Sequence, residues 1–212
     1  KIVFLGFGAM AFGGGIWSGF GVFFETLLDE FGGSRASLSL VITFGMVFWA
    51  IGAFMAGTLV NRFGPKKLIV FGVGLMGLGC FLSSATTSAI TLFTTYGLLI
   101  AMGTGFSTMN TNSVLVSQWF VRKRGIALGV STSGYNAGQL LLIPFTALLI
   151  GNYGWRWAFI IWGIMFWFLL APILLRYLKN SPEEIGLAPD NEPPGEVHFV
   201  DPVETRVRWI PR

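Results

Sequence analysis

The stretch Gly57-Thr58-Leu59-Val60-Asn61-Arg62-Phe63-Gly64-Pro65-Lys66-Lys67 lies between two long apolar runs and decides how the rest of the chain is organised. Gly64 is conformationally free, and Pro65 lacks a backbone N–H and disfavours helical geometry in the residue before it, so a helix ends here. The three cations are costly anywhere except in water or against anionic lipid headgroups. We therefore interpret the stretch as a tight basic turn between two membrane-buried helices.

The composition also indicates a membrane protein and excludes several function classes. Hydrophobic residues make up 53% of the chain and charged residues 11%, against roughly 25% charged in soluble domains. The net charge of +4 comes from clusters in loops, and no stretch suits binding to nucleic acid. Cys80 is the one cysteine and lies in an apolar span, and His198 is the one histidine and lies in a polar tail. We therefore expect no disulfide within the chain, no metal, no cofactor and no enzymatic activity.

Six segments are long and apolar enough to cross the hydrocarbon core, which takes about twenty residues. They predict an all-α membrane protein whose residues 1–179 form a six-helix bundle. The polar, proline-rich residues 180–212 predict a cytoplasmic linker or tail that need not have one conformation. The predicted spans are residues 2–24, 39–60, 68–86, 90–118, 126–150 and 156–176.

Basic residues alternate from loop to loop along the chain. They occur in the turn after the second span, in Arg122-Lys123-Arg124 after the fourth, and at Arg176 and Lys179 after the sixth, whereas the loop after the first span is net negative. The positive-inside rule then predicts a multi-pass protein of the plasma or inner membrane with both termini in the cytoplasm. A signal peptide is the alternative for the first span, but the apolar run continues to about Phe24, which favours a retained helix. We also expect residues to precede Lys1.

The fourth and fifth predicted spans are unusually polar. Hydroxyl and amide side chains recur along both, and each unsatisfied group costs several kcal/mol in hydrocarbon, so these spans are predicted to face a wet interior. Gly125, Gly129, Ser133 and Ala137 recur every four positions on the fifth span. Such a stripe serves either plain helix packing or a surface on which helices slide. Both interpretations stay open from the sequence.

The basic turn resembles the signature loop of the major facilitator superfamily, a glycine-x-leucine-x-aspartate-arginine-x-glycine-x-lysine/arginine run between helices two and three. Gly57, Leu59, Arg62, Gly64 and Lys66 match that run, and Asn61 replaces the usual aspartate. In that family the acidic group helps to latch the two halves of the transporter together. The resemblance therefore implies that the conformational loop motif is Gly57, Asn61, Arg62, Gly64 and Lys66, with a latch weakened at Asn61.

A second set of stretches resembles the monocarboxylate and oxalate/formate porters. The fifth-helix entry, Trp119 to Gly129 followed by Gly134-Tyr-Asn-Ala-Gly138, carries most of this likeness. Two departures stand out: Leu99 occupies the place of a fourth-helix arginine, and no lysine lies within the first span. Because no ionisable acid or base lies mid-membrane in these six spans, a charge that binds a carboxylate or couples protons must come from another half.

The resemblance implies the N-terminal half of a secondary active transporter, built as two inverted three-helix repeats that rock against a missing C-terminal six-helix half. It further implies a small organic anion as substrate, such as a monocarboxylate or dicarboxylate, with a coupled proton or an exchanged anion. The candidate cavity residues are Trp17, Ser18, Thr104, Thr108, Asn110, Thr111, Tyr135, Asn136 and Gln139.

Two alternatives remain beside this expectation. The polar groups of the fourth and fifth spans could simply hydrogen-bond to neighbouring helices, as buried polar groups in membrane bundles often do. The chain could also be a complete six-span protein that homodimerises as a channel or semi-transporter. A membrane enzyme is disfavoured, because apart from serine and threonine hydroxyls the spans offer no nucleophile, base or metal ligand at membrane depth.

Overall fold

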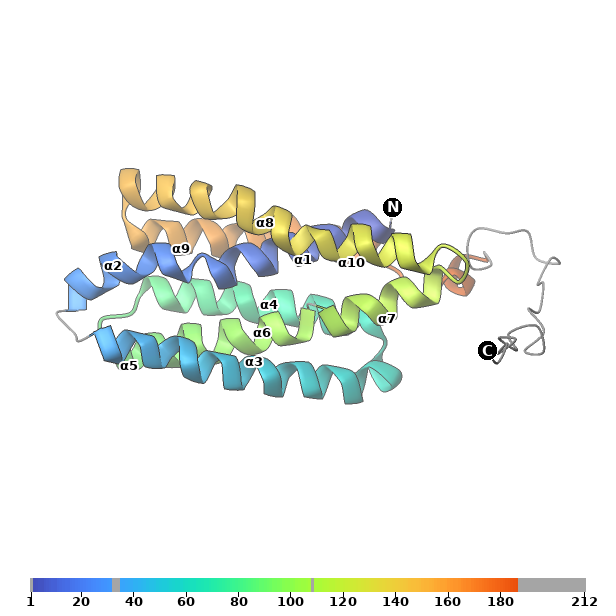
Figure 1. Ribbon diagram of the computed structural model, residues 1–212, viewed down its shortest axis with the longest axis horizontal. Helices are drawn as coiled ribbons and strands as arrows, with labels where there is room; N and C mark the ends of the chain where they lie inside the picture. Colours follow the sequence, from blue (N-terminus) through green and yellow to red (C-terminus); the bar gives the residue numbers. More distant parts are fainter. Residues whose placement is uncertain (1, 32–34, 108, 187–212) are drawn as a thin grey trace, which may run out of the picture.

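The computed structural model describes residues 2–31, 35–107 and 109–186 of the chain. Within them every regular element is helical, and six helical runs are long and apolar enough to cross a membrane. These runs lie side by side along the long axis of the molecule (Figure 1). The predicted all-α class with six spans is confirmed. The runs are Ile2–Phe31, Leu38–Phe63, Pro65–Ser84, Ala89–Trp119, Arg124–Tyr153 and Trp155–Tyr177.

Three of the six spans are single α-helices, and the other three are divided. Span two is α3 (Arg35–Phe63), span three is α4 (Pro65–Ser84) and span five is α8 (Arg124–Tyr153). Spans four and six contain π-helical turns, a rare geometry often found at functional sites. The divided spans are α1 (Ile2–Ser18) with α2 (Phe20–Phe31); α5 (Ala89–Leu92), η1 (Phe93–Ile100), α6 (Ala101–Ser107) and α7 (Met109–Trp119); and α9 (Trp155–Ile164), η2 (Met165–Leu170) and α10 (Ala171–Tyr177).

Glycine decides which helices come closest together. The helix α1 packs along α8, and α3 packs along α6 and η1, while α4 lies between α6 and α9. A side chain at Gly134 would collide with the backbone of Phe7, and one at Gly138 with the backbone of Ala11. The pair Gly134 and Gly138 therefore serves helix packing. The stripe residues Gly125 and Gly129 have no such neighbour among the described residues.

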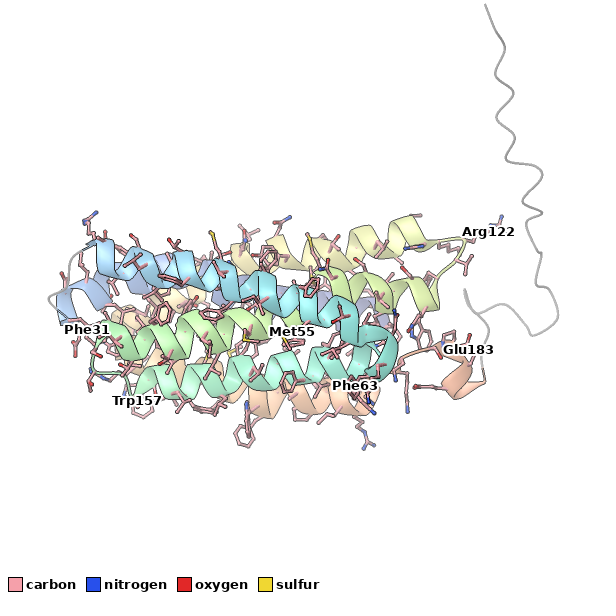
Figure 2. All side chains as sticks on the ribbon, turned by 90° about the horizontal axis from the view of Figure 1, so that it is seen from below. Phe31, Met55, Phe63, Arg122, Trp157 and Glu183 are labelled. Carbon is pink, nitrogen blue, oxygen red and sulfur yellow. The ribbon has the colours of Figure 1, made fainter. Side chains whose placement is uncertain are left out.

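The same helix junction occurs twice, once in each half of the bundle. Gly64 links α3 to α4 with φ 79° and ψ 155°, and Gly154 links α8 to α9 with φ 85° and ψ 163°. Only glycine adopts this backbone region readily. The two junctions lie at opposite ends of the bundle, as the labels of Phe63 and Trp157 show in Figure 2. This arrangement agrees with two three-helix repeats of inverted topology.

The two ends of the bundle differ in charge. We call the end that carries Arg62, Lys66, Lys67 and the Arg122 loop the basic end (Figure 2). At the opposite end Arg156 donates to Glu30 at 2.8 Å. Both of these side chains are nearly half exposed, so in water the pair contributes at most about 1 kcal/mol to stability.

Candidate functional site

A hollow of about 270 Å³ lies where the broken first span meets spans two, four and five. Ile42, which lines it, lies in the first third of α3, so the hollow is nearer the end opposite to the basic end. No carboxylate, ammonium, guanidinium or imidazole group is among its walls within the described residues. The lining residues are Trp17, Ser18, Phe20, Gly21, Ile42, Tyr96 and Tyr135.

One polar bridge crosses the bundle beside this hollow. Gln139 on α8 donates its side-chain amide to the Ser18 hydroxyl at 2.7 Å. Tyr135, which lines the hollow, lies one turn before Gln139 on the same helix, and residues four apart share a helix face. The bridge joins the broken span one to span five, and it brings together the sequence-predicted residues Ser18 and Gln139.

Aromatic rings form much of the remaining wall. The ring of Trp17 stacks on that of Tyr96 with centroids 6.3 Å apart, and the ring of Phe20 lies 4.5 Å from that of Tyr96. Such a surface holds the apolar part of a ligand, while the hydroxyl and amide groups of Ser18, Tyr135 and Gln139 supply hydrogen bonds. The described residues cannot neutralise a carboxylate at this position.

The remaining predicted cavity residues do not reach the hollow. Thr104 is buried, donates to the Ile100 carbonyl at 2.8 Å and contacts the Met76 sulfur at 3.4 Å, so it faces α4. Thr111 is buried and donates to the Phe106 carbonyl at 2.7 Å. Asn110 and Asn136 are exposed on the outside of the described bundle. Thr108 lies outside the described residues. The structure thus unites Trp17, Ser18, Tyr135 and Gln139 and separates the others from them.

Sequence reasoning missed Tyr96, Phe20, Gly21 and Ile42 as lining residues. Tyr96 carried a usable signal, because a tyrosine inside an apolar run needs a hydrogen-bond partner for its hydroxyl. The other three are ordinary apolar or small residues, and nothing in their spacing distinguishes them from packing residues. Their role depends on the break in span one.

A second polar pair serves packing nearer the basic end. The Asn112 side-chain amide donates to the Ser131 hydroxyl at 2.8 Å, and both residues are fully buried. Gly6 on α1 leaves room for this pair, because a side chain there would collide with Asn112. The pair joins spans four and five through a hydrogen bond, as the alternative interpretation of the polar spans predicts.

The basic turn is tied to the segment that follows span six. Asn180 accepts from the backbone N–H of Lys66 at 3.0 Å and so caps the start of α4. The Asn180 side-chain amide donates to Glu184 at 2.8 Å, and the Trp119 indole donates to the Asn180 carbonyl at 3.2 Å. Three connections at the basic end are thereby joined: the turn after span two, the end of span four and the start of the post-span-six segment.

This cap involves residues that the sequence places in a linker. Pro182–Ile185 form the short 3₁₀ turn η3, and a hydrogen bond from the Ser181 side chain lowers the pKa of Glu183. Residues 180–186 therefore have a defined conformation against the bundle, whereas the predicted tail from residue 187 onward lies outside the described residues. The boundary at residue 180 stays a prediction.

The other residues of the predicted loop motif have few contacts. Asn61 and Arg62 are exposed, and the Arg62 guanidinium lies 5.4 Å from the centre of the Phe63 ring. A side chain at Gly57 would meet open space. Within the described bundle, therefore, only Gly64 and the backbone of Lys66 take part in the cap.

Six membrane-length helices in two inverted three-helix repeats, with a hollow between spans one, two, four and five, define a multi-pass α-helical membrane protein. The family model of the Major Facilitator Superfamily matches residues 4–210. The chain belongs to the Major Facilitator Superfamily, as the turn at Gly57–Lys67 predicts.

Several curated relatives are similar to the chain at 26–29% identity. Monocarboxylate transporter 2 of Rattus norvegicus is 28% identical over 76% of the chain, and monocarboxylate transporter 7 of Homo sapiens is 29% identical over 76%. The uncharacterized MFS-type transporter YcxA of Bacillus subtilis (strain 168) is 26% identical over 77%. The matched parts make up 33%, 32% and 40% of these relatives, so the chain spans about a third of their length.

Proposed function

We propose that this chain is the N-terminal half of a secondary active transporter that moves a small organic anion, a monocarboxylate or dicarboxylate, by alternating access. The observation that carries the proposal is the uncharged hollow between spans one, two, four and five, with its Gln139–Ser18 bridge. Relatives named monocarboxylate transporters support the substrate class. A coupled proton or an exchanged anion would accompany the substrate.

The second six-helix half is the proposed partner, and spans two and five offer the faces for it. In the apolar middle of α3, and likewise of α8, 22% of the residues are buried, against 50% in span one. Large apolar side chains on these faces, such as Phe54 and Leu140, are about three-quarters exposed. Because the described lining of the hollow carries no charge that could bind the anion, the second half would supply it.

The proposed orientation places the basic end in the cytoplasm of a plasma or inner membrane. The start of α1 lies at that end, and so does the Glu183 turn after span six (Figures 1 and 2). Excess lysine and arginine on one side of the membrane set the orientation of multi-pass proteins. The start of span one and the segment after span six would therefore both face the cytoplasm.

Uptake by the complete gene product in proteoliposomes tests this function. With labelled lactate and labelled oxalate as probes, we expect uptake of at least one of the two anions above that of protein-free liposomes. Tyr135→Phe and Gln139→Ala should each raise KM by about threefold to tenfold, because each removes one hydrogen-bonding side-chain group at or beside the hollow. Tyr153→Phe and Gln118→Ala, at exposed positions outside the cavity, are the matched controls. Unaltered KM in both cavity variants would contradict the assignment of the site.

Asn61 allows a test of the proposed latch at the basic end. Asn61→Asp restores the carboxylate of the superfamily pattern at an exposed position. We expect it to favour the state in which the basic ends of the two halves are closed together, and to change the transport rate by about threefold or more, as one charge-assisted hydrogen bond allows. Cross-linking between cysteines on the two basic ends measures that state. If Asn61→Asp and the unmodified protein gave equal cross-linking and equal transport rates, position 61 would not contribute to a latch between the two halves.

A further inference from the structure

The first span is interrupted at the wall of the hollow. The helix α1 ends at Ser18 and α2 begins at Phe20, with Gly19 between them. The backbone N–H of Gly19 donates to Gly15 at 2.8 Å, and a side chain at Gly19 would lie 2.6 Å from that same carbonyl oxygen. Only glycine therefore fits at the interruption.

An interruption of this kind disturbs the regular helical hydrogen bonds on either side of it. In a continuous helix the carbonyls of Ile16 and Trp17 accept from the N–H groups of Phe20 and Gly21, four residues further on. Within a membrane every such group needs another partner, since lipid offers none. If these carbonyls had no partner in the broken form, the span would be more stable as a continuous helix.

Tyr96 supplies the missing partner from span four. Its hydroxyl donates to the Ile16 carbonyl at 2.6 Å and lies 3.2 Å from the Trp17 carbonyl. The side chain is 1% exposed, and its ring is held between Trp17 and Phe20, the residues on either side of the break. Tyr96 itself belongs to the π-helical turn η1. One side chain thus contacts both halves of the broken span and donates its hydroxyl hydrogen to a carbonyl beside the break.

We propose that Tyr96 is a positioning residue of the transport cavity: it holds span one in its broken form and so sets the affinity for substrate. The broken form presents Trp17, Ser18, Phe20 and Gly21 to the hollow, and it places Ser18 where Gln139 reaches it. Without the hydroxyl, Ile16 and Trp17 pair again with the N–H groups of the next turn, and the segment from Ser18 to Gly21 rotates away from the cavity. This inference rests on the proposed function.

The test uses the complete gene product, with Tyr96→Phe to remove the hydroxyl and keep the ring. Tyr177→Phe, an exposed tyrosine on α10, is the matched control. The first readout needs no substrate: Gly21→Cys, where a side chain meets open space, is modified with a water-soluble thiol reagent in a background without other cysteines. We expect Tyr96→Phe to lower the rate of modification by about threefold or more, because it removes one hydrogen bond that holds the break. The control should leave the rate unchanged.

The second readout separates positioning from mere stabilisation. Tyr96→Phe should raise KM for lactate by about threefold to tenfold with kcat nearly unchanged, as expected for a loss of ground-state binding. A purely structural role would lower the amount of folded protein and leave KM as it is, which would overturn the proposal. Unchanged modification at position 21 would overturn it as well. If the unmodified protein takes up neither lactate nor oxalate, the proposed function fails, while modification at position 21 still decides whether Tyr96 holds the break.

Hydrogen exchange on the unmodified protein covers the case in which Tyr96→Phe does not fold. The amides of Phe20 and Gly21 should exchange at least about tenfold faster than those of residues 10–15 of the same span, because they begin a new helix after the interruption and the first amides of a helix are poorly protected. Equal protection along the whole span would show a continuous helix and would overturn the proposal.

Discussion

Gly138→Leu should strongly impair folding of the six-helix bundle. A side chain at this position would collide with the backbone of Ala11, where α1 and α8 approach each other closely. Main chain cannot rotate away as a side chain can, so the two helices must separate, and overpacking of this kind costs about 3 kcal/mol or more. We expect the yield of monodisperse protein in size-exclusion chromatography to fall by about tenfold or more.

Gly151→Leu is the matched control for this prediction. Gly151 lies on the same helix, is exposed, and a side chain there would meet open space. Glycine lowers helix stability by up to about 1 kcal/mol relative to other residues, so this variant should keep the yield or raise it. Similar yields of Gly138→Leu and Gly151→Leu would mean that α1 and α8 do not approach each other at Gly138.

Gly64→Ala should destabilise the bundle more than the same change at the equivalent junction, Gly154. Both glycines have a backbone geometry that costs other residues about 1–3 kcal/mol. At Gly64 an added side chain would also lie 2.6 Å from the Asn180 side-chain oxygen, which accepts from Lys66, and loss of a cap costs about 1 kcal/mol more. The midpoint of thermal unfolding in detergent measures both variants.

Gly154→Ala carries the strain without the collision, because nothing lies within 4 Å of the position that its side chain would occupy. It should therefore unfold at a temperature between those of the unmodified protein and of Gly64→Ala. Asn180→Ala in addition to Gly64→Ala should cost little more than Gly64→Ala alone, since the cap is already lost. Equal midpoints for Gly64→Ala and Gly154→Ala would show that Asn180 does not cap α4.

The sequence predicts the spans and the superfamily because both depend on local features. About twenty apolar residues span the hydrocarbon core wherever they occur, and the turn at Gly64-Pro65 breaks a helix by covalent geometry alone. Helix ends were less predictable: span one continues to Phe31 and span five to Tyr153, since apolar content does not mark where a helix stops in water.

The lining of the hollow was predicted only in part, because polarity alone does not say which face of a helix a side chain occupies. Thr104 and Tyr135 are both polar groups in predicted inner spans, yet Thr104 faces α4 and Tyr135 lines the hollow. Rotation of a helix about its own axis is decided by packing, and here it follows from the contact of Gly134 and Gly138 with α1. Tyr96 lines the hollow as well. Its hydroxyl contacts the carbonyls of Ile16 and Trp17, which are 80 and 79 residues away in the sequence.

The sequence by itself determined that this is a membrane protein with six spans, and it indicated the superfamily. Both follow from local features, namely the length of the apolar segments and the glycine–proline turn. The tertiary structure decided where span one breaks, which side chains surround the hollow and which residue caps the basic turn. Each of these depends on partners far apart in the chain: Tyr96 with Ile16, Gln139 with Ser18, and Asn180 with Lys66. A buried polar group must find a partner in the folded bundle, and only the packing of the helices determines which partner is within reach.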